Sequence, residues 1–176
     1  MRAASSKKQS ENMLICGGSG ILIHVVGLSD IGLIRSRNED SFLIDKETGI
    51  FIICDGMGGH KGGDVASDMA IKTVTEELNK SAVLNKDLIN QAIRKANHDI
   101  WLGGIDNPDL FEMGTTLVLA RILNKNLDIF HVGDSRAYLV RGNEIIQVTK
   151  DHTLAEEMRQ KGVASAERES YNHILT

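Results

Sequence analysis

The chain has 176 residues, enough for one domain, and its shares of apolar (41%) and charged (25%) residues are ordinary for a globular protein. Its net charge of −4 argues against a surface that binds nucleic acid or an anionic membrane. The two cysteines, Cys16 and Cys54, form no disulfide framework, which favours a cytoplasmic location.

The first residues are expected to lie outside the folded domain. Residues 1–20 are polar and then rich in glycine, which predicts a flexible tail. The apolar stretch 13–27 resembles a signal-peptide core, but three glycines and His24 interrupt it and no small-residue cleavage site follows. It is also too short and too broken to span a membrane. The domain is therefore predicted to occupy residues 21–176.

Most of the predicted elements are strands joined by short turns. Turn sequences such as Lys46-Glu47-Thr48-Gly49 and Gly142-Asn143 separate neighbouring apolar runs. Strands joined by such short turns are expected to pair in antiparallel fashion. The predicted strands are 21–27, 41–45, 50–54, 115–123, 127–132, 136–140 and 145–148.

Two long helices are predicted between these strands. Apolar residues recur at helical spacing over 64–79 and again over 85–102. Asp64 or a neighbour can cap the first helix, and Gly103-Gly104 is expected to end the second.

The last predicted helix, at 154–160, follows Asp151-His152-Thr153, and Gly162 is expected to stop it. Asp151 and His152 are expected to cap this helix and to brace the loop before it. Strands, then helices, then strands again predict an α+β fold with helices packed on antiparallel sheets, because a parallel α/β fold would alternate strand and helix.

A candidate binding site follows the apolar strand at 50–54, in the sequence Asp55-Gly56-Met57-Gly58-Gly59-His60. The strand delivers a carboxylate, and the glycines allow the backbone to come close to a bound group. A hard divalent cation or a phosphate would suit such a place. Asp-Gly is also a common turn dipeptide, so a simple chain reversal is the alternative.

Two more motifs place carboxylates beside strands. One is 35–40 (RSRNED), before a strand, and the other is 131–136 (HVGDSR), between two strands. Carboxylates and a backbone carbonyl are the ligands that Mg²⁺ and Mn²⁺ prefer, whereas no Cys/His group has the spacing of a zinc site. Taken singly, the first motif could be a solvated turn and the second a hairpin with a local Asp–Arg pair.

Together, these motifs resemble those of the PPM-type metal-dependent Ser/Thr protein phosphatases, also called the phosphatase 2C family, in their bacterial form. The order and spacing match from about Val25 to Thr176. Asp-Gly alone is a weak signal, but five motifs in order are a strong one. The matching segments are 32–41 (GLIRSRNEDS), 54–60 (CDGMGGH), 113–116 (MGTT), 131–138 (HVGDSRAY) and 148–153 (VTKDHT).

The resemblance implies a fold and a metal site. The implied fold is an antiparallel β-sandwich flanked by helices in αββα layers, with two Mn²⁺ or Mg²⁺ ions and a position for a third. By similarity, Asp55 bridges the two ions, the carbonyl of Gly56 binds one of them, and Glu39 acts at the second through water. Asp134, with Asp40 behind a water, matches the position of the third, weaker ion.

The implied reaction is hydrolysis of phosphoserine or phosphothreonine in proteins by a metal-activated water. Arg35 matches the residue that binds the substrate phosphate, for which a guanidinium is well suited. Eukaryotic members carry a histidine where this chain has Met57. His60 is therefore a candidate general acid, and a turn histidine or a metal-bound water as the donor are the alternatives. The expected partners are phosphoproteins and a kinase, and the expected state is a monomer.

Relatives in this family continue beyond the position of Thr176 and supply two further aspartates to the metal site. We therefore expect the fold to be incomplete at the C-terminus and the activity of this chain to be impaired, because ligand charge sets metal affinity. The alternative function is a non-catalytic pseudo-phosphatase module that binds phosphoproteins or metals.

Overall fold

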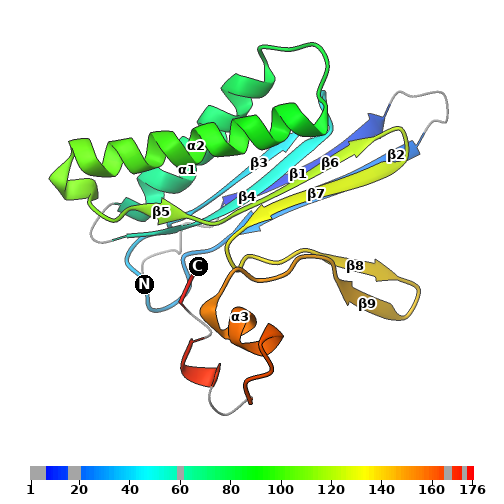
Figure 1. The fold of residues 1–176 in the computed structure, drawn as a ribbon. Coiled ribbons are helices and arrows are strands. Elements are labelled where there is room, and N and C mark those ends of the chain that lie inside the picture. Colours follow the sequence, from blue (N-terminus) through cyan, green and yellow to red (C-terminus); the bar gives the residue numbers. More distant parts are fainter. Residues whose placement is uncertain (1–6, 16–20, 59–61, 165–167, 172–173) are drawn as a thin grey trace.

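The computed structural model describes residues 7–15, 21–58, 62–164, 168–171 and 174–176, and it contains strands followed by two helices and then further strands (Figure 1). Among the described residues, the helices are all too short or too polar to cross a membrane. The strands are β1 (Lys7–Ile15), β2 (Ile21–Ser29), β3 (Asp40–Asp45), β4 (Ile50–Met57), β5 (Gly114–Thr115), β6 (Leu117–Leu123), β7 (Asn126–Val132), β8 (Tyr138–Arg141) and β9 (Glu144–Gln147). The helices are α1 (Gly62–Leu78), α2 (Lys86–Asp106), α3 (Leu154–Gln160) and two short 3-10 turns, η1 (Pro108–Leu110) and η2 (Glu169–Tyr171).

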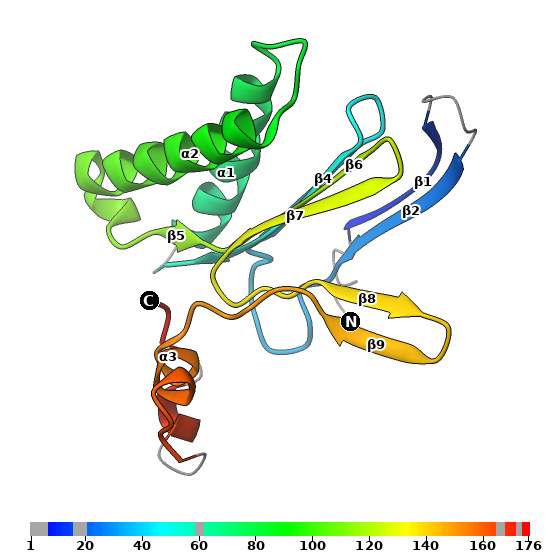
Figure 2. The same cartoon turned by 45° about the vertical axis from the view of Figure 1, so that its right-hand side comes forward.

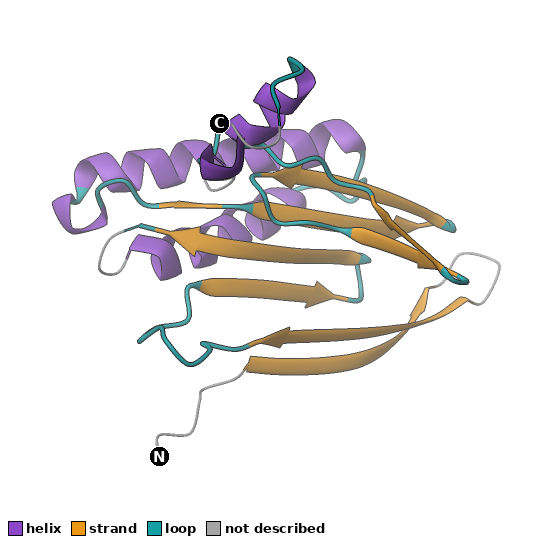
Figure 3. Ribbon diagram, turned by 90° about the horizontal axis from the view of Figure 1, so that it is seen from below, coloured by secondary structure: helices purple, strands orange, loops and turns teal. Residues whose placement is uncertain are grey.

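The central sheet has the strand order β3-β4-β6-β7, and β5 pairs with the end of β4. All of its pairs are antiparallel. Figure 3 shows these strands lying side by side, and Figures 1 and 2 show α1 and α2 covering one face of them. The predicted α+β fold of antiparallel sheets and packed helices is confirmed.

The core lies between this sheet and the two helices. Ile50 and Ile52 of β4 and Leu119 of β6 are buried there with residues of both helices. On α1 the side chains that face the sheet are small, with Ala66 and Ala70 one turn apart, so the helix can approach the strands closely. Burial of these apolar side chains is the main force that holds α1 and α2 on the sheet.

The opposite face of the central sheet is turned toward β1–β2 and β8–β9 (Figure 2). β2 packs tightly against β3, since a Cβ atom on Gly27 would lie 2.4 Å from the ring of Phe42. A cavity of about 310 Å³ remains between β2 and this face of the sheet, with Phe51 and Ile129 in its lining. The second layer of the sandwich therefore contacts the central sheet at one end and stands away from it elsewhere.

Alternation along β4 decides which face carries the candidate carboxylate. Successive side chains of a strand point to opposite faces. Ile52 and Cys54 are buried on the helix side, so Asp55 points to the other face, where it is exposed. β4 also runs further than predicted, because Gly56 and Met57 pair with Thr115 and Gly114. Asp55 therefore lies inside the strand, two residues before its end.

The prediction of a flexible tail over 1–20 is wrong for residues 7–15, which form β1. This strand pairs with β2 along its length, from Lys7 opposite Ser29 to Ile15 opposite Ile21. The physical reason is that β2 offers a row of backbone donors and acceptors that a polar segment can satisfy as well as an apolar one. Residues 1–6 and 16–20 lie outside the described residues.

Of two predicted helix boundaries, the end of α2 is wrong and the bounds of α3 are confirmed. α2 continues past Gly103-Gly104 to Asp106, so the prediction that these glycines end it is wrong. They serve close packing instead: a Cβ atom on Gly103 would lie 2.7 Å from Cε of Met113. α3 has the predicted bounds, and its N-cap is Thr153, whose hydroxyl accepts a hydrogen bond from the amide of Glu156.

Candidate metal and phosphate site

The centre of the candidate site is a pair of carboxylates on neighbouring strands. Asp40, the first residue of β3, lies directly opposite Asp55 of β4. Both residues belong to the lining of a cavity of about 230 Å³, together with Ser135 from the turn after β7. A larger cavity of about 480 Å³ lies between α2 and the sheet, but it is mainly apolar and contains none of the candidate carboxylates.

Hydrogen bonds fix Asp40 in this place. The hydroxyl of Ser29 donates to Oδ2 of Asp40 at 3.1 Å, and the side-chain Nδ2 of Asn38 donates to the same hydroxyl at 2.7 Å. The side chain of Asn38 also accepts from the backbone amide of Asp40 at 3.1 Å. The end of β2 and the start of β3 are thereby joined around one carboxylate.

Glu39 is held by its backbone at the point where β4 meets α1. Its carbonyl accepts from the amide of Gly56 at 3.1 Å and from the hydroxyl of Ser67 at 2.7 Å. Only glycine fits here: a Cβ atom on Gly56 would lie 2.0 Å from the carbonyl oxygen of Gly63. A Cβ atom on Gly63 would in turn lie 2.8 Å from Oε1 of Glu39. These glycines let strand and helix cross closely enough to place Glu39 beside Gly56.

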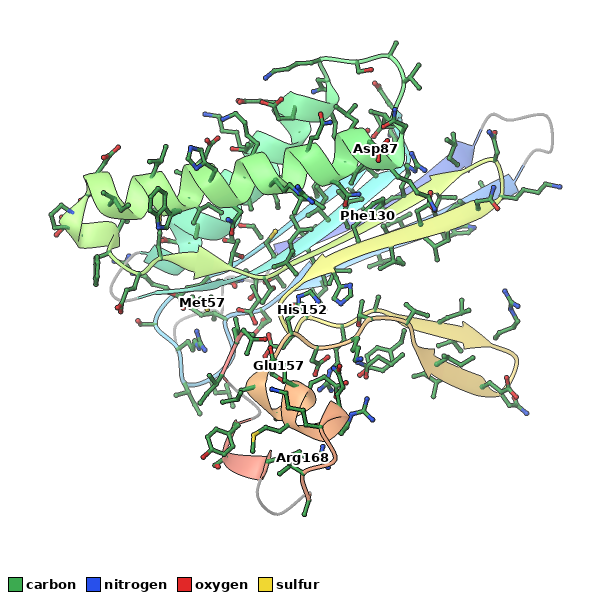
Figure 4. All side chains as sticks on the ribbon, in the orientation of Figure 1. Met57, Asp87, Phe130, His152, Glu157 and Arg168 are labelled. Carbon is green, nitrogen blue, oxygen red and sulfur yellow. The ribbon has the colours of Figure 1, made fainter. Side chains whose placement is uncertain are left out.

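Asp134 reaches the site on a turn between β7 and β8. The preceding Gly133 has a φ of +94°, a conformation that glycine adopts readily. Gly133 exchanges two hydrogen bonds with His152: its amide donates to Nδ1 at 3.3 Å, and its carbonyl accepts from the His152 amide at 3.0 Å. His152 lies between the central sheet and α3 (Figure 4), so the segment before α3 braces this turn.

The alternative reading of this turn as a local Asp–Arg pair is wrong, because Arg136 pairs with Asp151. Nε of Arg136 donates to both carboxylate oxygens of Asp151 at 3.0 Å. Asp151 thus braces the loop, as predicted, and leaves the helix cap to Thr153. Asp134 is consequently not the partner of the arginine two residues away.

The electrostatics of the site favour a bound cation. The pKa of Asp55 is raised, first because its carboxylate has lost part of its solvent and second because of the charge of Asp40. Asp134 raises it further, whereas Arg35 lowers it. Among the described residues, however, no group of three or more His, Cys, Asp and Glu side chains could hold a metal ion as placed. The oxygen donors fit Mn²⁺ or Mg²⁺ in kind, but they form only part of a coordination shell.

Arg35 lies at the edge of this acidic cluster. Its Nη1 donates to Oε2 of Glu39 at 2.8 Å, and its side chain is 66% exposed. The guanidinium is therefore both near the carboxylates and accessible from solvent. His60, the candidate general acid, falls at 59–61, outside the described residues. Met57, labelled in Figure 4, is half exposed at the end of β4.

Sequence reasoning missed Thr116 and Ser135, which link Asp55 to the turn of Asp134. The Thr116 hydroxyl accepts from the amide of Asp55 at 3.0 Å and lies 2.6 Å from Oγ of Ser135. The sequence did contain a signal, since Thr115-Thr116 are polar residues at the head of an otherwise apolar strand.

Comparisons with known proteins agree with this geometry. Residues 35–169 match the family model described as protein phosphatase 2C. The chain is 38% identical over 159 residues to the serine/threonine phosphatase Stp of Listeria welshimeri, covering 86% of this chain and 63% of that protein. It is 34% identical over 156 residues to the serine/threonine protein phosphatase PstP of Mycobacterium tuberculosis, covering 87% of this chain and 29% of that protein.

Solved structures give the same result. The crystal structure of the M. tuberculosis phosphatase PstP superposes with a TM-score of 0.70 at 28% identity, over 98% of this chain and 66% of that one. The catalytic domain of PstP in complex with two manganese ions superposes with a TM-score of 0.69 at 28% identity, over 95% and 65%. The chain thus spans 63% of the length of the Listeria relative. With more than half of its residues matched by the family model, the chain belongs to the protein phosphatase 2C family.

Proposed function

We propose that this protein hydrolyses phosphoserine and phosphothreonine in other proteins with the help of divalent metal ions. The observation that carries the proposal is the Asp40–Asp55 pair, placed beside Glu39 and within reach of the exposed Arg35. Relatives named as serine/threonine phosphatases support the reaction, and a relative's structure with two manganese ions supports the metal.

In this proposal the ions are Mn²⁺ or Mg²⁺, two of them with a position for a third. Asp55 would serve both of the first two ions, the carbonyl of Gly56 would bind one of them, and Glu39 would act at the second through water. Asp40 and Asp134 hold the third. When bound, the ions would supply a hydroxide near neutral pH to attack the phosphorus.

The residues of the chain itself bind and orient the substrate. Arg35 can turn its guanidinium from Glu39 to the phosphate, where two parallel hydrogen bonds fix the oxygens and offset their charge. We propose His60 as the donor of the proton that the leaving serine or threonine oxygen needs.

The test is phosphate release from a phosphothreonine peptide by the 176-residue chain with Mn²⁺. We expect turnover that Asp55→Asn abolishes and that Asp87→Asn, at the far start of α2 (Figure 4), leaves intact. Because no group of three ligands is assembled among the described residues, we expect weak metal binding, since the number and charge of the ligands set the affinity. Equal turnover by Asp55→Asn and the unaltered chain would overturn the proposal.

The same partial ligand set favours a second candidate function, a non-catalytic module that binds phosphoproteins or metals. The two functions give different results in one experiment. A module would bind the phosphopeptide through Arg35 in a one-to-one complex and release no phosphate at any Mn²⁺ concentration. An enzyme would release many phosphates per chain.

A further inference from the structure

At Asp55, which carries the central carboxylate, one of the two backbone hydrogen bonds of the strand pair is replaced by a hydrogen bond to a side chain. Ile53 lies opposite Val118 and Gly56 opposite Thr115, so the register places Thr116 opposite Asp55. The Thr116 amide donates to the carbonyl of Asp55 at 2.9 Å, as an antiparallel pair requires. The Asp55 amide, however, donates to the hydroxyl of Thr116 at 3.0 Å.

The hydroxyl of Thr116 thus takes the place of its own backbone carbonyl as the acceptor. The hydroxyl of Thr115 lies 3.0 Å from that carbonyl and 3.0 Å from the carbonyl of Asp55, and it can donate to one of them at a time. Thr116 is only 4% exposed, so water cannot replace these contacts, and loss of a buried partner would be costly. The side chain of Thr116 is therefore part of the ladder that holds Asp55.

The same side chain contacts both residues that flank Asp134. Its hydroxyl lies 2.6 Å from Oγ of Ser135, and either group can be the donor. Its methyl group lies where Gly133 passes, since a Cβ atom on Gly133 would come within 2.7 Å of it. One buried residue thus meets Asp55 through its hydroxyl and holds the turn of Asp134 on both sides.

We propose that Thr116 is a positioning residue that holds the turn of Asp134 against the Asp55 strand and so sets the affinity of the site for Mn²⁺. This inference rests on the proposed metal-dependent function. Its physical reason is that Asp55 and Asp134 carry like charges, which drive the turn away from the strand when no cation is bound. The Thr116–Ser135 hydrogen bond and the fit of the methyl group against Gly133 oppose that movement.

The first test is Mn²⁺ binding, measured as free Mn²⁺ by electron paramagnetic resonance. Thr116→Val keeps the shape and removes the hydroxyl, and Ser135→Ala removes its partner. Each is expected to raise the Kd for Mn²⁺ about tenfold, which corresponds to about 1.4 kcal/mol. Thr116→Ser keeps the hydroxyl and should bind within about threefold of the unaltered chain, a difference well under 1 kcal/mol.

A matched control is available in Thr73→Val, which removes a buried hydroxyl from the middle of α1. It should leave Mn²⁺ binding unchanged. The double variant Thr116→Val/Ser135→Ala should bind no more weakly than Thr116→Val alone, because Thr116→Val already breaks the link to Ser135. Unaltered Mn²⁺ affinity in Thr116→Val, or additive losses in the double variant, would overturn the inference.

The second test needs no metal. Amide exchange followed by NMR in metal-free protein should be faster at Asp55 in Thr116→Val than in Thr116→Ser. The amide signal of Asp134 should shift in Thr116→Val and Ser135→Ala but not in Thr73→Val. If the unaltered chain fails to bind Mn²⁺, the proposed function fails, and this NMR test still decides whether Thr116 positions Asp134. An Asp134 amide signal that does not shift in Thr116→Val contradicts the inference. If Thr116→Val does not fold, the Asp134 amide signal in Ser135→Ala decides instead.

Discussion

Asp40 and Asp55 face each other across the β3–β4 pair, two carboxylates in direct cross-strand register. Like charges in this arrangement destabilise a sheet, and the charge of Asp40 contributes to the raised pKa of Asp55. Nothing in the packing of the fold requires this pair, because Asp55 is exposed on the face away from the helices. A residue pair that costs stability without serving the core is typical of a functional site.

Replacing Asp55 by asparagine should therefore stabilise the metal-free protein. The expected gain is roughly 0.2–1 kcal/mol in the free energy of unfolding, because one cross-strand repulsion is removed. Urea unfolding at neutral pH in the presence of EDTA measures it. Added Mn²⁺ should then stabilise the unaltered chain but not Asp55→Asn, since a ligand stabilises only the form that binds it. If Asp55→Asn is less stable than the unaltered chain in EDTA, this account is contradicted. Asp87→Asn is the control.

Arg35→Ala should weaken phosphopeptide binding without unfolding the protein. The Arg35–Glu39 ion pair is exposed, so its loss should change the free energy of unfolding by less than about 1 kcal/mol. Arg35→Lys keeps the charge but not the planar fork and should bind with intermediate affinity. Arg37→Ala, in the same exposed segment, is the control. Fluorescence anisotropy of a labelled phosphopeptide measures the effect, and equal losses in the Arg35 and Arg37 variants would argue against a specific phosphate contact.

Gly56→Ala should disrupt the crossing of β4 and α1. The added methyl group would lie 2.0 Å from a backbone oxygen of Gly63 and 2.6 Å from that of Glu39, and neither atom can move alone. We expect a loss of about 3 kcal/mol or more in the free energy of unfolding, at the upper end for overpacking. Gly142→Ala is the control: its φ is +60° but nothing lies within 4 Å, so only about 1–2 kcal/mol is expected. Urea unfolding of both variants measures these losses. If the free energy of unfolding falls by a similar amount in the two, the close crossing of β4 and α1 is not what makes Gly56 necessary.

The sequence predicted the elements that have a strong periodic signal. The helix at 154–160 has its predicted bounds, and both long helices and the β3, β4, β6 and β7 strands lie close to theirs. Glu39, Asp40 and Asp55 were proposed as site residues because they lie in motifs whose order resembles that of a known family. What brings them together, the register of β3 and β4, follows from the short turn between two alternating strands.

The errors lie where tertiary contacts outweigh local preference. Gly103-Gly104 has the sequence of a helix end, yet Met113 packs against it and α2 continues. The polar segment 7–15 has little strand propensity of its own and forms β1 by pairing with β2. The polar pair Thr115-Thr116 was a signal in the sequence, but the role of Thr116 depends on its contact with Ser135, 19 residues further along the chain, which only the folded structure shows.

The ion pair of Arg121 and Asp128 predicts how the stability of the protein depends on pH. Arg121 is only 6% exposed, and its guanidinium binds Asp128 and the carbonyl of Leu84. Lys86 also binds Asp128, at 2.8 Å. These bonds, first that of Lys86 and then that of Arg121, lower the pKa of Asp128 below its usual value. This pair joins the start of α2 to the β6–β7 hairpin.

Asp128→Asn should therefore destabilise the protein at neutral pH by about 1–3 kcal/mol, because Arg121 loses its charged acceptor while staying buried. A lowered pKa means that the stabilisation by Asp128 is complete above the unfolded-state pKa of about 3.9 and is lost as the pH falls through the folded-state value. The stability gap between the two proteins should thus be constant from about pH 7 to pH 5 and close at lower pH. Lys86→Met, which removes the exposed partner, should cost less than about 1 kcal/mol. Urea unfolding across this pH range decides the matter, since a gap that persists below the folded-state pKa would mean that the carboxylate charge of Asp128 does not stabilise the fold.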